Sequence, residues 1–310
     1  MRNGHLGAMT AITYAICAAV WGTTWFAIRV CIAPGGYPPY AAAALRFSLA
    51  SVILGGLWLA GVARPGPRRR RDVAWMVAAG LCNGGSYALV YTAEGALPGG
   101  LVAVLFGTFP LVTAALAGIT RTERIARASL VGAAVSAAGI AVVFYDQLDL
   151  SADRAAAVAL ALGAVVLSAG YSVIMKRHTA GQHPLAATGV FVAITAAVLW
   201  LASAALDDRG IPAAPAASAT VALVYLGVVG SVVVFASYFA LLKRASLMTV
   251  STLVFIQPLI ALAVDAVWER SAPTGVRAYA GAAIVLAGVA ISVLPGAARS
   301  RAARAAARAG

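Results

Sequence analysis

The stretch AAAVALALGAVVLSAGYSVIM, residues 155–175, contains no charged side chain and is followed at once by Lys176 and Arg177. A helix that crosses the hydrocarbon core of a bilayer needs about 20 apolar residues, so this stretch predicts a transmembrane helix with a basic flank. The whole chain has the same character, because 62% of its 310 residues are hydrophobic, only 11% are charged, and the mean hydropathy is +0.90. Soluble domains do not have that balance, and the sequence predicts a polytopic membrane protein.

Nine further apolar stretches bring the number of predicted transmembrane helices to ten, and no strand is required. The first is expected to remain uncleaved, because residues 3–28 carry no charged side chain whereas a cleavable signal has roughly 7 to 15 apolar residues. The predicted fold class is therefore an all-α integral membrane protein. We expect helices over residues 10–30, 40–61, 73–93, 99–119, 129–145, 155–175, 185–206, 218–240, 246–267 and 277–294.

The basic residues mark one side of the membrane. Most of the 23 Lys and Arg residues lie after every second predicted helix or in the tail, while the acidic residues gather in the other connections. By the positive-inside rule both termini are cytoplasmic, in a multi-pass protein of the cell inner (plasma) membrane. This placement explains the net charge of +13 without a nucleic-acid partner, and the arginine run additionally favours contact with anionic membrane lipid. The residues placed inside are Arg2, Arg64, Arg68–Arg71, Arg121, Arg124, Arg127, Lys176, Arg177, Lys243, Arg244, Arg299, Arg301, Arg304 and Arg308.

The chain contains an internal repeat. The segment GAAVSAAGIA, residues 132–141, recurs as GAAIVLAGVA, residues 281–290, at an offset of 149, and Pro110 and Pro258 precede the two copies at nearly the same offset. A repeat of five helices is an odd number, so the second copy would run inverted relative to the first. We therefore predict two inverted five-helix repeats. Their expected extents are 1–147 and 148–298, followed by a basic cytoplasmic tail over 299–310.

Four segments together identify a resemblance. WGTTWFAIR (residues 21–29), Pro38-Pro39 before Leu45-Arg46-Phe47, and the stretches 110–123 and 258–269 resemble, in this order, the EamA group of the drug/metabolite transporter superfamily. The resemblance covers nearly the whole chain and implies a secondary transporter, commonly an exporter of amino acids or other small metabolites. It also implies a cavity lined chiefly by the first, third, fourth, sixth, eighth and ninth helices, with the fifth and tenth as a scaffold. Arg29 departs from the family, where lysine is more usual, and the absence of a glutamate in the first helix disfavours simple proton-for-cation antiport.

Ionisable side chains within the predicted spans are candidate functional residues, because a charge at membrane depth costs about 2.5 to 3.5 kcal/mol on insertion scales. Arg46 and Arg29 are candidate substrate-binding residues, and the default alternative is that both snorkel to the outer interface. Asp265 is the candidate coupling residue, with a structural contact to an arginine as the alternative. Glu123 and Glu269 are expected to be structural. Two arginines with one aspartate suit a zwitterion or a weak acid better than a lipophilic cation.

Aromatic and hydroxyl-bearing side chains complete the candidate binding site. Trp21 and Trp25 share one helix face, as do Tyr87 and Tyr91, because four residues make slightly more than one turn. Such stripes either stack on a ligand or anchor the helices at the interface. The other candidate substrate-binding residues are Thr108, Ser168, Tyr171 and Gln257.

Two prolines and four glycines are expected to shape the helices. Pro110 and Pro258 are predicted to remove a backbone hydrogen bond in mid-helix and to free carbonyls near the bilayer midplane, which makes them candidate hinges. Glycines seven residues apart favour close helix packing. They are Gly132 with Gly139, and Gly281 with Gly288.

The predicted function is transport of a small polar metabolite such as an amino acid, with export through a central cavity by alternating access. A multidrug-type efflux carrier is the alternative within the same class, and a non-transporting membrane enzyme or structural protein is the alternative from another class. No cofactor and no metal are predicted, because Cys17, Cys31 and Cys82 lack metal-ligand spacing and are expected to be buried thiols. The predicted partners are the small-molecule substrate and membrane lipid, and a monomer is expected to suffice.

Overall fold

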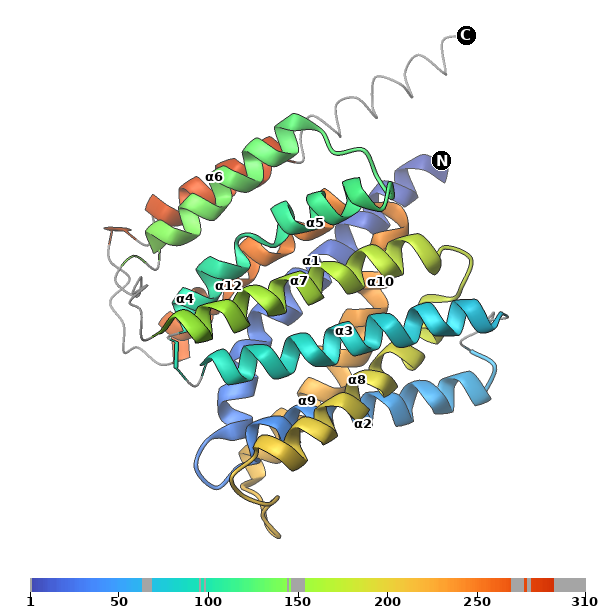
Figure 1. Cartoon of the computed structure of the whole chain (residues 1–310), viewed down its shortest axis with the longest axis vertical. Coiled ribbons are helices and arrows are strands. Elements are labelled where there is room, and N and C mark those ends of the chain that lie inside the picture. The colour runs from blue at the N-terminus through green and yellow to red at the C-terminus, as the bar shows by residue number, and fades with distance from the viewer. Residues whose placement is uncertain are drawn as a thin grey trace.

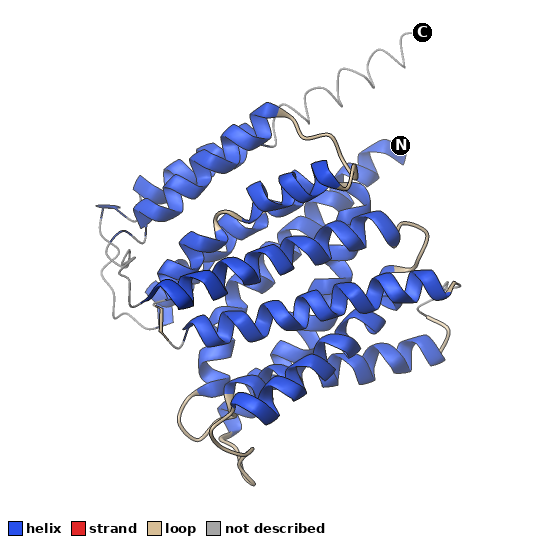
Figure 2. Ribbon diagram, in the orientation of Figure 1, coloured by secondary structure: helices blue, strands red, loops and turns tan. Residues whose placement is uncertain are grey.

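The computed structural model describes residues 2–62, 69–94, 96–97, 99–143, 145, 154–268, 276–277 and 280–292. Within these residues the chain is helical and contains no strand (Figure 2). Seven helical segments are long and apolar enough to cross a membrane, and the apolar helices Arg127–Val143, Leu247–Ile260 and Ala280–Ser292 are shorter. The elements are α1 (Arg2–Ile32), α2 (Pro39–Leu59), α3 (Arg70–Glu94), α4 (Gly99–Phe106), α5 (Phe109–Ile119), α6 (Arg127–Val143), α7 (Ala155–His178), α8 (Pro184–Leu206), α9 (Ala217–Gly227), the π-helix η3 (Val228–Val233), α10 (Val234–Arg244), α11 (Leu247–Ser251) and α12 (Leu253–Trp268).

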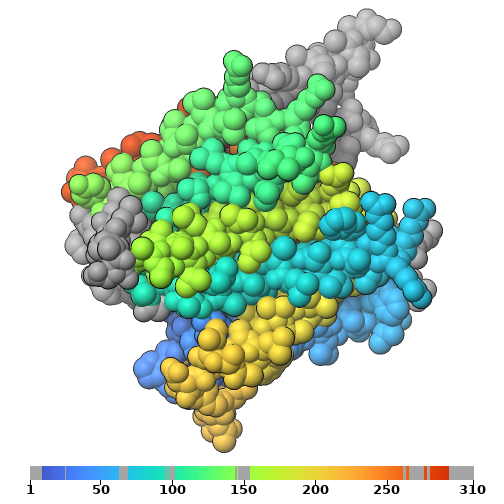
Figure 3. Space-filling view, in the orientation of Figure 1, coloured from blue at the N-terminus to red at the C-terminus, as the bar shows by residue number. Residues whose placement is uncertain are grey.

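The helices form one bundle in which segments far apart in the sequence lie side by side (Figure 1). Helix α3 packs against both α7 and α8, α2 packs against α8, and α1 packs against α9, α10 and α12. The space-filling view in Figure 3 shows α7, α3 and α8 as adjacent bands across one face. Each half of the chain therefore contributes helices to the same interior.

The helix predicted over 99–119 is interrupted. Helix α4 ends at Phe106 and α5 begins at Phe109, so that Pro110 lies in the first turn of α5 and not in mid-helix. A proline is well accommodated there, because the first N–H groups of a helix have no intrahelical acceptor. At the break the Thr108 hydroxyl donates to the carbonyl of Leu105 (2.7 Å), which competes with regular helical bonding. The mid-helix position predicted for Pro110 is thus wrong.

The helix predicted over 246–267 is also divided, at Thr252, into α11 and α12. Pro258 lies inside α12, as predicted, where its ring removes one hydrogen bond of the helical ladder.

The helix predicted over 218–240 runs without a gap, but its middle is a π-helix, η3. There the Ser231 hydroxyl donates to the carbonyl of Leu226, five residues earlier (3.0 Å). Insertions of this kind are rare and often occur at functional sites.

The glycines of the repeated segment pack one helix tightly against another, as the sequence predicts. A Cβ atom added at Gly132 of α6 would lie 2.4 Å from the carbonyl oxygen of Gly288, and one added at Gly139 would lie 3.0 Å from that of Gly281. Gly288 and Gly281 belong to the helix Ala280–Ser292. Because the earlier glycine of α6 meets the later glycine of its partner, the two helices are antiparallel.

Candidate functional site

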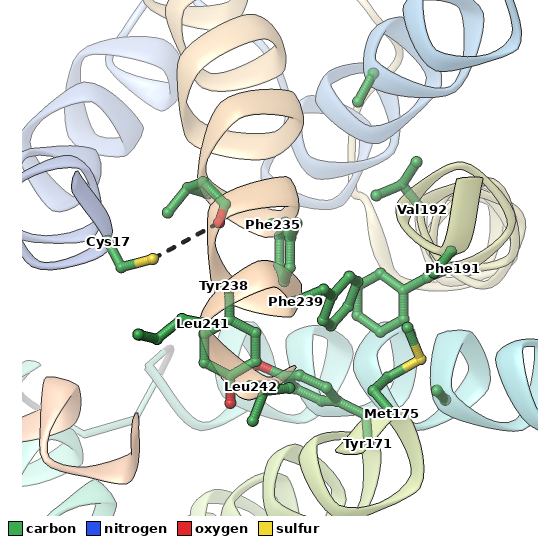
Figure 4. Close-up of a cluster of buried hydrophobic side chains, with 14 of the residues drawn as sticks. Cys17, Tyr171, Met175, Phe191, Val192, Phe235, Tyr238, Phe239, Leu241 and Leu242 are labelled. Carbon is green, nitrogen blue, oxygen red and sulfur yellow. Dashed lines mark hydrogen bonds between the residues drawn. The ribbon is translucent and has the colours of Figure 1, made fainter. Parts of the chain in front are cut away.

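The centre of the bundle is filled by an aromatic cluster with members from six helices. The Trp21 ring lies 5.1 Å from that of Tyr238 and 5.7 Å from that of Phe235, measured between centroids. Figure 4 shows Phe191, Phe235 and Phe239 packed together beside Tyr171 and Tyr238. Close edge-to-face and tilted ring pairs of this kind are favourable. The cluster consists of Trp21 (α1), Phe47 (α2), Tyr87 (α3), Tyr171 (α7), Phe191 (α8), and Phe235, Tyr238 and Phe239 (α10).

Arg46 lies on the edge of this cluster and is only 1% exposed. Its Nε donates to the hydroxyl of Ser231 (3.1 Å) and its Nη2 donates to the carbonyl of Gly230 (2.8 Å). The guanidinium carbon also lies 5.0 Å from the ring centroid of Phe47 and 5.6 Å from that of Tyr87, within the range of cation–π attraction. The alternative that Arg46 snorkels to the interface is therefore wrong.

The charge of Arg46 is not neutralised by the described part of the chain. No carboxylate among these residues lies within ion-pair distance of the guanidinium, and Nη1 makes no hydrogen bond to them. Moving a charge out of water is costly unless it is paired. The two acceptors and two rings offset part of that cost and leave a cation with free donor capacity inside the bundle.

The two acceptors of Arg46 both belong to η3. A π-turn changes the direction of backbone groups relative to an α-helix, and here the carbonyl of Gly230 is turned toward Arg46. Gly230 also allows close approach, because a Cβ at this position would lie 3.0 Å from Cγ2 of Thr24. The irregular segment thus accepts both hydrogen bonds of the guanidinium and joins α2 to η3.

Hydroxyl groups connect the helices around the aromatic cluster. Ser86 of α3 and Ser168 of α7 share a hydrogen bond (2.8 Å), and Ser86 also donates to the carbonyl of Ala164 (2.9 Å). Ser172 of α7 and Tyr238 of α10 share another (2.8 Å). These polar atoms lie beside aromatic rings, which is the mixture that pockets for small polar ligands present.

The structure brings together several of the residues singled out in the sequence and separates others. Arg46, Trp21, Tyr87, Tyr171 and Ser168 lie in or beside the aromatic cluster. Three other candidates lie elsewhere. Arg29 is exposed in the last turn of α1, with its guanidinium carbon 6.0 Å from the Phe26 ring centroid. Thr108 lies at the break before α5, and Gln257 is half-buried on α12.

The side chains of Trp25 and Asp265 lie outside the described residues, although the backbone of each belongs to a helix, α1 and α12. Glu269 also lies outside them. Cys17 and Cys31 are buried and Cys82 is half-buried, and all three are free thiols.

Sequence reasoning missed Ser231, Gly230, Phe191, Phe235 and Tyr238. The available signal was the pair Gly230-Ser231 inside the run VVGSVV, because a small residue beside a polar one in an apolar span suits close approach to a buried polar group. The phenylalanines gave no signal, since an apolar ring suits lipid as well as the interior.

Polar contacts at the helix ends join neighbouring helices. At the end where basic residues gather, Lys176 of α7 donates to the carbonyls of Leu242 and Ala245 (2.6 Å for Ala245) at the end of α10. Glu123 accepts from the backbone N–H of Leu247 (2.9 Å) and caps α11, which is a structural role at a helix N-terminus. At the other end, Asp207 accepts from the backbone N–H groups of Tyr40 and Ala41 in the first turn of α2.

Comparison with known proteins identifies relatives over most of the chain. A family model described as the EamA-like transporter family matches residues 9–145 and again residues 155–294. A protein of Escherichia coli K12 called an uncharacterized inner membrane transporter, YedA, is 26% identical over 246 residues, which are 78% of this chain and 77% of that protein. A protein of Streptantibioticus cattleyicolor called a probable terminal-alkyne amino-acid exporter is 28% identical over 285 residues, or 88% of this chain and 90% of that protein.

One solved structure, described only as the crystal structure of a protein, has the same fold. Its TM-score is 0.77 at 20% identity, and the match covers 92% of this chain and 97% of that one.

Proposed function

This chain belongs to the EamA-like transporter family, and from that premise we propose that it exports a small polar metabolite, such as an amino acid, across the inner membrane by alternating access. The observation that carries the proposal is the buried Arg46 guanidinium, which has no carboxylate partner in the described chain and stands beside aromatic rings. A substrate carboxylate would supply the missing charge through charge-assisted hydrogen bonds. The apolar part of the solute would pack against the rings.

The proposed site is built around that carboxylate contact. Nη1 of Arg46 keeps free donors, Tyr87 of α3 lies beside the guanidinium, and Trp21 of α1 belongs to the same aromatic cluster. Ser168 and Tyr171 of α7 contribute a hydroxyl and a ring. Trp25, Arg29, Thr108 and Gln257 stay candidates from the sequence alone.

We also propose that the ten predicted helices form two inverted repeats, 1–147 and 148–298, before the basic tail 299–310. The double match of the family model supports this arrangement. So do the antiparallel glycine contacts: at an offset of 149 the pair Gly132 and Gly288 maps onto the pair Gly281 and Gly139, which is how contacts across a two-fold axis behave. The contact of α3 with α7 likewise corresponds to that of α10 with α1.

Alternating access requires segments that bend and, where transport is driven by protons, a group that binds them. Pro258 inside α12 and Pro110 at the start of α5 are the proposed hinges, because both lie close to a change in helical hydrogen bonding. Asp265 on α12 is the proposed coupling residue, on the general rule that acids within a span mark ion pathways.

The function is tested by solute flux. We expect vesicles reconstituted with the purified chain and loaded with a mixture of amino acids to release at least one of them faster than vesicles without protein, as measured by mass spectrometry of the external solution. Movement of lipophilic cations alone would replace the proposal with multidrug efflux. No flux of either class would remove transport of these solutes and favour the enzyme or structural alternative.

The orientation is tested by labelling single cysteines in a background in which Cys17, Cys31 and Cys82 are replaced by alanine. Asp208 after α8 and Arg124 before α6 are both exposed, and the charge pattern places them on opposite sides. We expect Asp208→Cys to react with an impermeant maleimide added to intact cells, and Arg124→Cys to react only after the cells are broken. The reverse pattern would contradict cytoplasmic termini.

A further inference from the structure

A cavity with several polar lining residues lies away from Arg46, where the α7–α8 loop meets the end of α10. Its volume is about 500 Å³, which falls within the usual range for a pocket that holds a small ligand. Gln182 and His183 line it from the loop, and Lys243 and Arg244 line it from the last turn of α10. Small residues such as Gly181 and Ala240 leave the space open. No member of the aromatic cluster borders this cavity.

Two polar atoms of the lining residues have no partner. Gln182 is only 8% exposed, and its side-chain Oε1 is buried without a hydrogen bond in the described structure; the same holds for Nδ1 of His183. Buried polar atoms are nearly always hydrogen-bonded, and an exception calls for an explanation. Lys243 donates to the backbone carbonyl of Gln182, and this bond fixes the loop against α10. It leaves the side-chain Oε1 of Gln182 unpaired.

The chemistry of the lining specifies the ligand. Lys243 and Arg244 supply two cations on one wall, and guanidinium groups in particular bind phosphate oxygens in a fork. Gln182 and His183 line the other wall, and their unpaired Oε1 and, in the appropriate tautomer, Nδ1 are acceptors that a rotation of either side chain would turn toward a ligand. We propose that this cavity binds a phosphate ester whose alcohol portion carries hydrogen-bond donors, such as the phosphoglycerol headgroup of phosphatidylglycerol.

The position of the cavity favours a lipid as the source of this ester. It lies at the ends of two apolar spans, Pro184–Leu206 and Ala217–Arg244, and beside the loop that follows a third, Ala155–His178. Helix ends of membrane-spanning segments lie at the level of the headgroups, and basic pockets between helices on the cytoplasmic side bind anionic headgroups. A soluble ester such as glycerol phosphate has the same recognition chemistry without the acyl chains.

The proposal is tested by native mass spectrometry of the purified, delipidated full chain with phosphatidylglycerol and phosphatidylcholine of matched acyl chains. We expect one phosphatidylglycerol to be retained in preference to phosphatidylcholine, whose headgroup has a phosphate but no donor. Arg244→Ala should lower its retention at least about fivefold, because a guanidinium contact to phosphate is lost. The matched control is Arg124→Ala, which removes an exposed arginine from a loop at the same end of the bundle and should retain the lipid as the parent does.

A second variant tests the acceptor. Gln182→Met keeps the size and apolar stem of the side chain but removes the amide oxygen, so it should show a smaller preference for phosphatidylglycerol than the parent while remaining folded by circular dichroism. Equal retention by Arg244→Ala and Arg124→Ala, or no preference for phosphatidylglycerol in the parent, would overturn the proposal. A rise in unfolding temperature with glycerol phosphate as large as that with lipid would assign the site to a soluble ester, and a rise with lipid alone would assign it to the bilayer.

Discussion

Arg46→Lys is expected to weaken binding of the exported solute by about tenfold to hundredfold. Arg46 uses Nε and Nη2 to reach Ser231 and Gly230 and keeps Nη1 for a carboxylate, whereas a lysine ammonium is a single point on a flexible stem and cannot do both. Loss of one hydrogen bond to a charged group costs about 1.5 to 3 kcal/mol, and each tenfold change in affinity is about 1.4 kcal/mol. The expected range follows from these two values.

The measurement is calorimetry of purified protein with the solute that the flux assay identifies. Arg209→Lys is the matched control, because Arg209 is an exposed arginine of the α8–α9 loop. This variant should bind the solute with the same affinity as the parent. Thermal unfolding without solute separates the two roles of Arg46. If Arg46→Lys lowers the unfolding temperature but binds the solute normally, the arginine joins α2 to η3 and is not part of the binding site.

The positions of the helices could be predicted from the sequence because they depend on quantities that the sequence contains. The run 155–175 becomes α7, Ala155–His178, since length and apolar content alone decide whether a segment spans a bilayer. Gly132 and Gly139 predict close packing for a similar reason, because the absence of a side chain is what allows two backbones to approach.

The environment of Arg46 could not be predicted in the same way. An arginine about two turns into an apolar helix suits both a lipid-facing position, from which it snorkels, and an interior position, and the sequence of α2 is apolar on every side. What decides between them is η3, in a helix 184 residues later, where a carbonyl and a hydroxyl turn toward the guanidinium. Gly230 of η3 lies against Thr24 and Arg46, and the local sequence does not reveal these contacts with other helices.

The break at Gly107 and Thr108 shows a related limit. Proline at position 110 predicts a disturbed helix, but the helix can stop before the proline or bend at it. The structure ends α4 at Phe106, four residues before the proline, and Thr108 bonds to the carbonyl of Leu105 in the break. In α12 the corresponding proline lies inside a continuous helix, so the same residue type has different local effects in the two halves.

Gly230→Ala is expected to reduce solute affinity about fivefold to hundredfold even though it adds only one methyl group. The new Cβ would lie 3.0 Å from Cγ2 of Thr24 and 3.5 Å from Nη2 of Arg46, so η3 must move away from α1 and from the guanidinium. Overpacking of this kind costs about 1 to 3 kcal/mol. We expect that cost to appear in binding, because the displaced carbonyl of Gly230 is what orients Arg46.

A second substitution should reverse the effect. Thr24→Ser removes Cγ2 and keeps the hydroxyl that donates to the carbonyl of Trp21 (2.7 Å). When Gly230→Ala is combined with Thr24→Ser, the methyl group at position 230 therefore fits, and solute affinity should return to within about twofold of the parent. Gly55→Ala is the control for adding a methyl group to a helical glycine, because nothing lies within 4 Å of its Cβ position. Calorimetry of the parent and the three variants decides the matter. If the double variant binds the solute as weakly as Gly230→Ala alone, the contact between α1 and η3 does not position Arg46. Recovery of solute affinity in the double variant means that the distance between these two helices controls how the guanidinium meets its ligand.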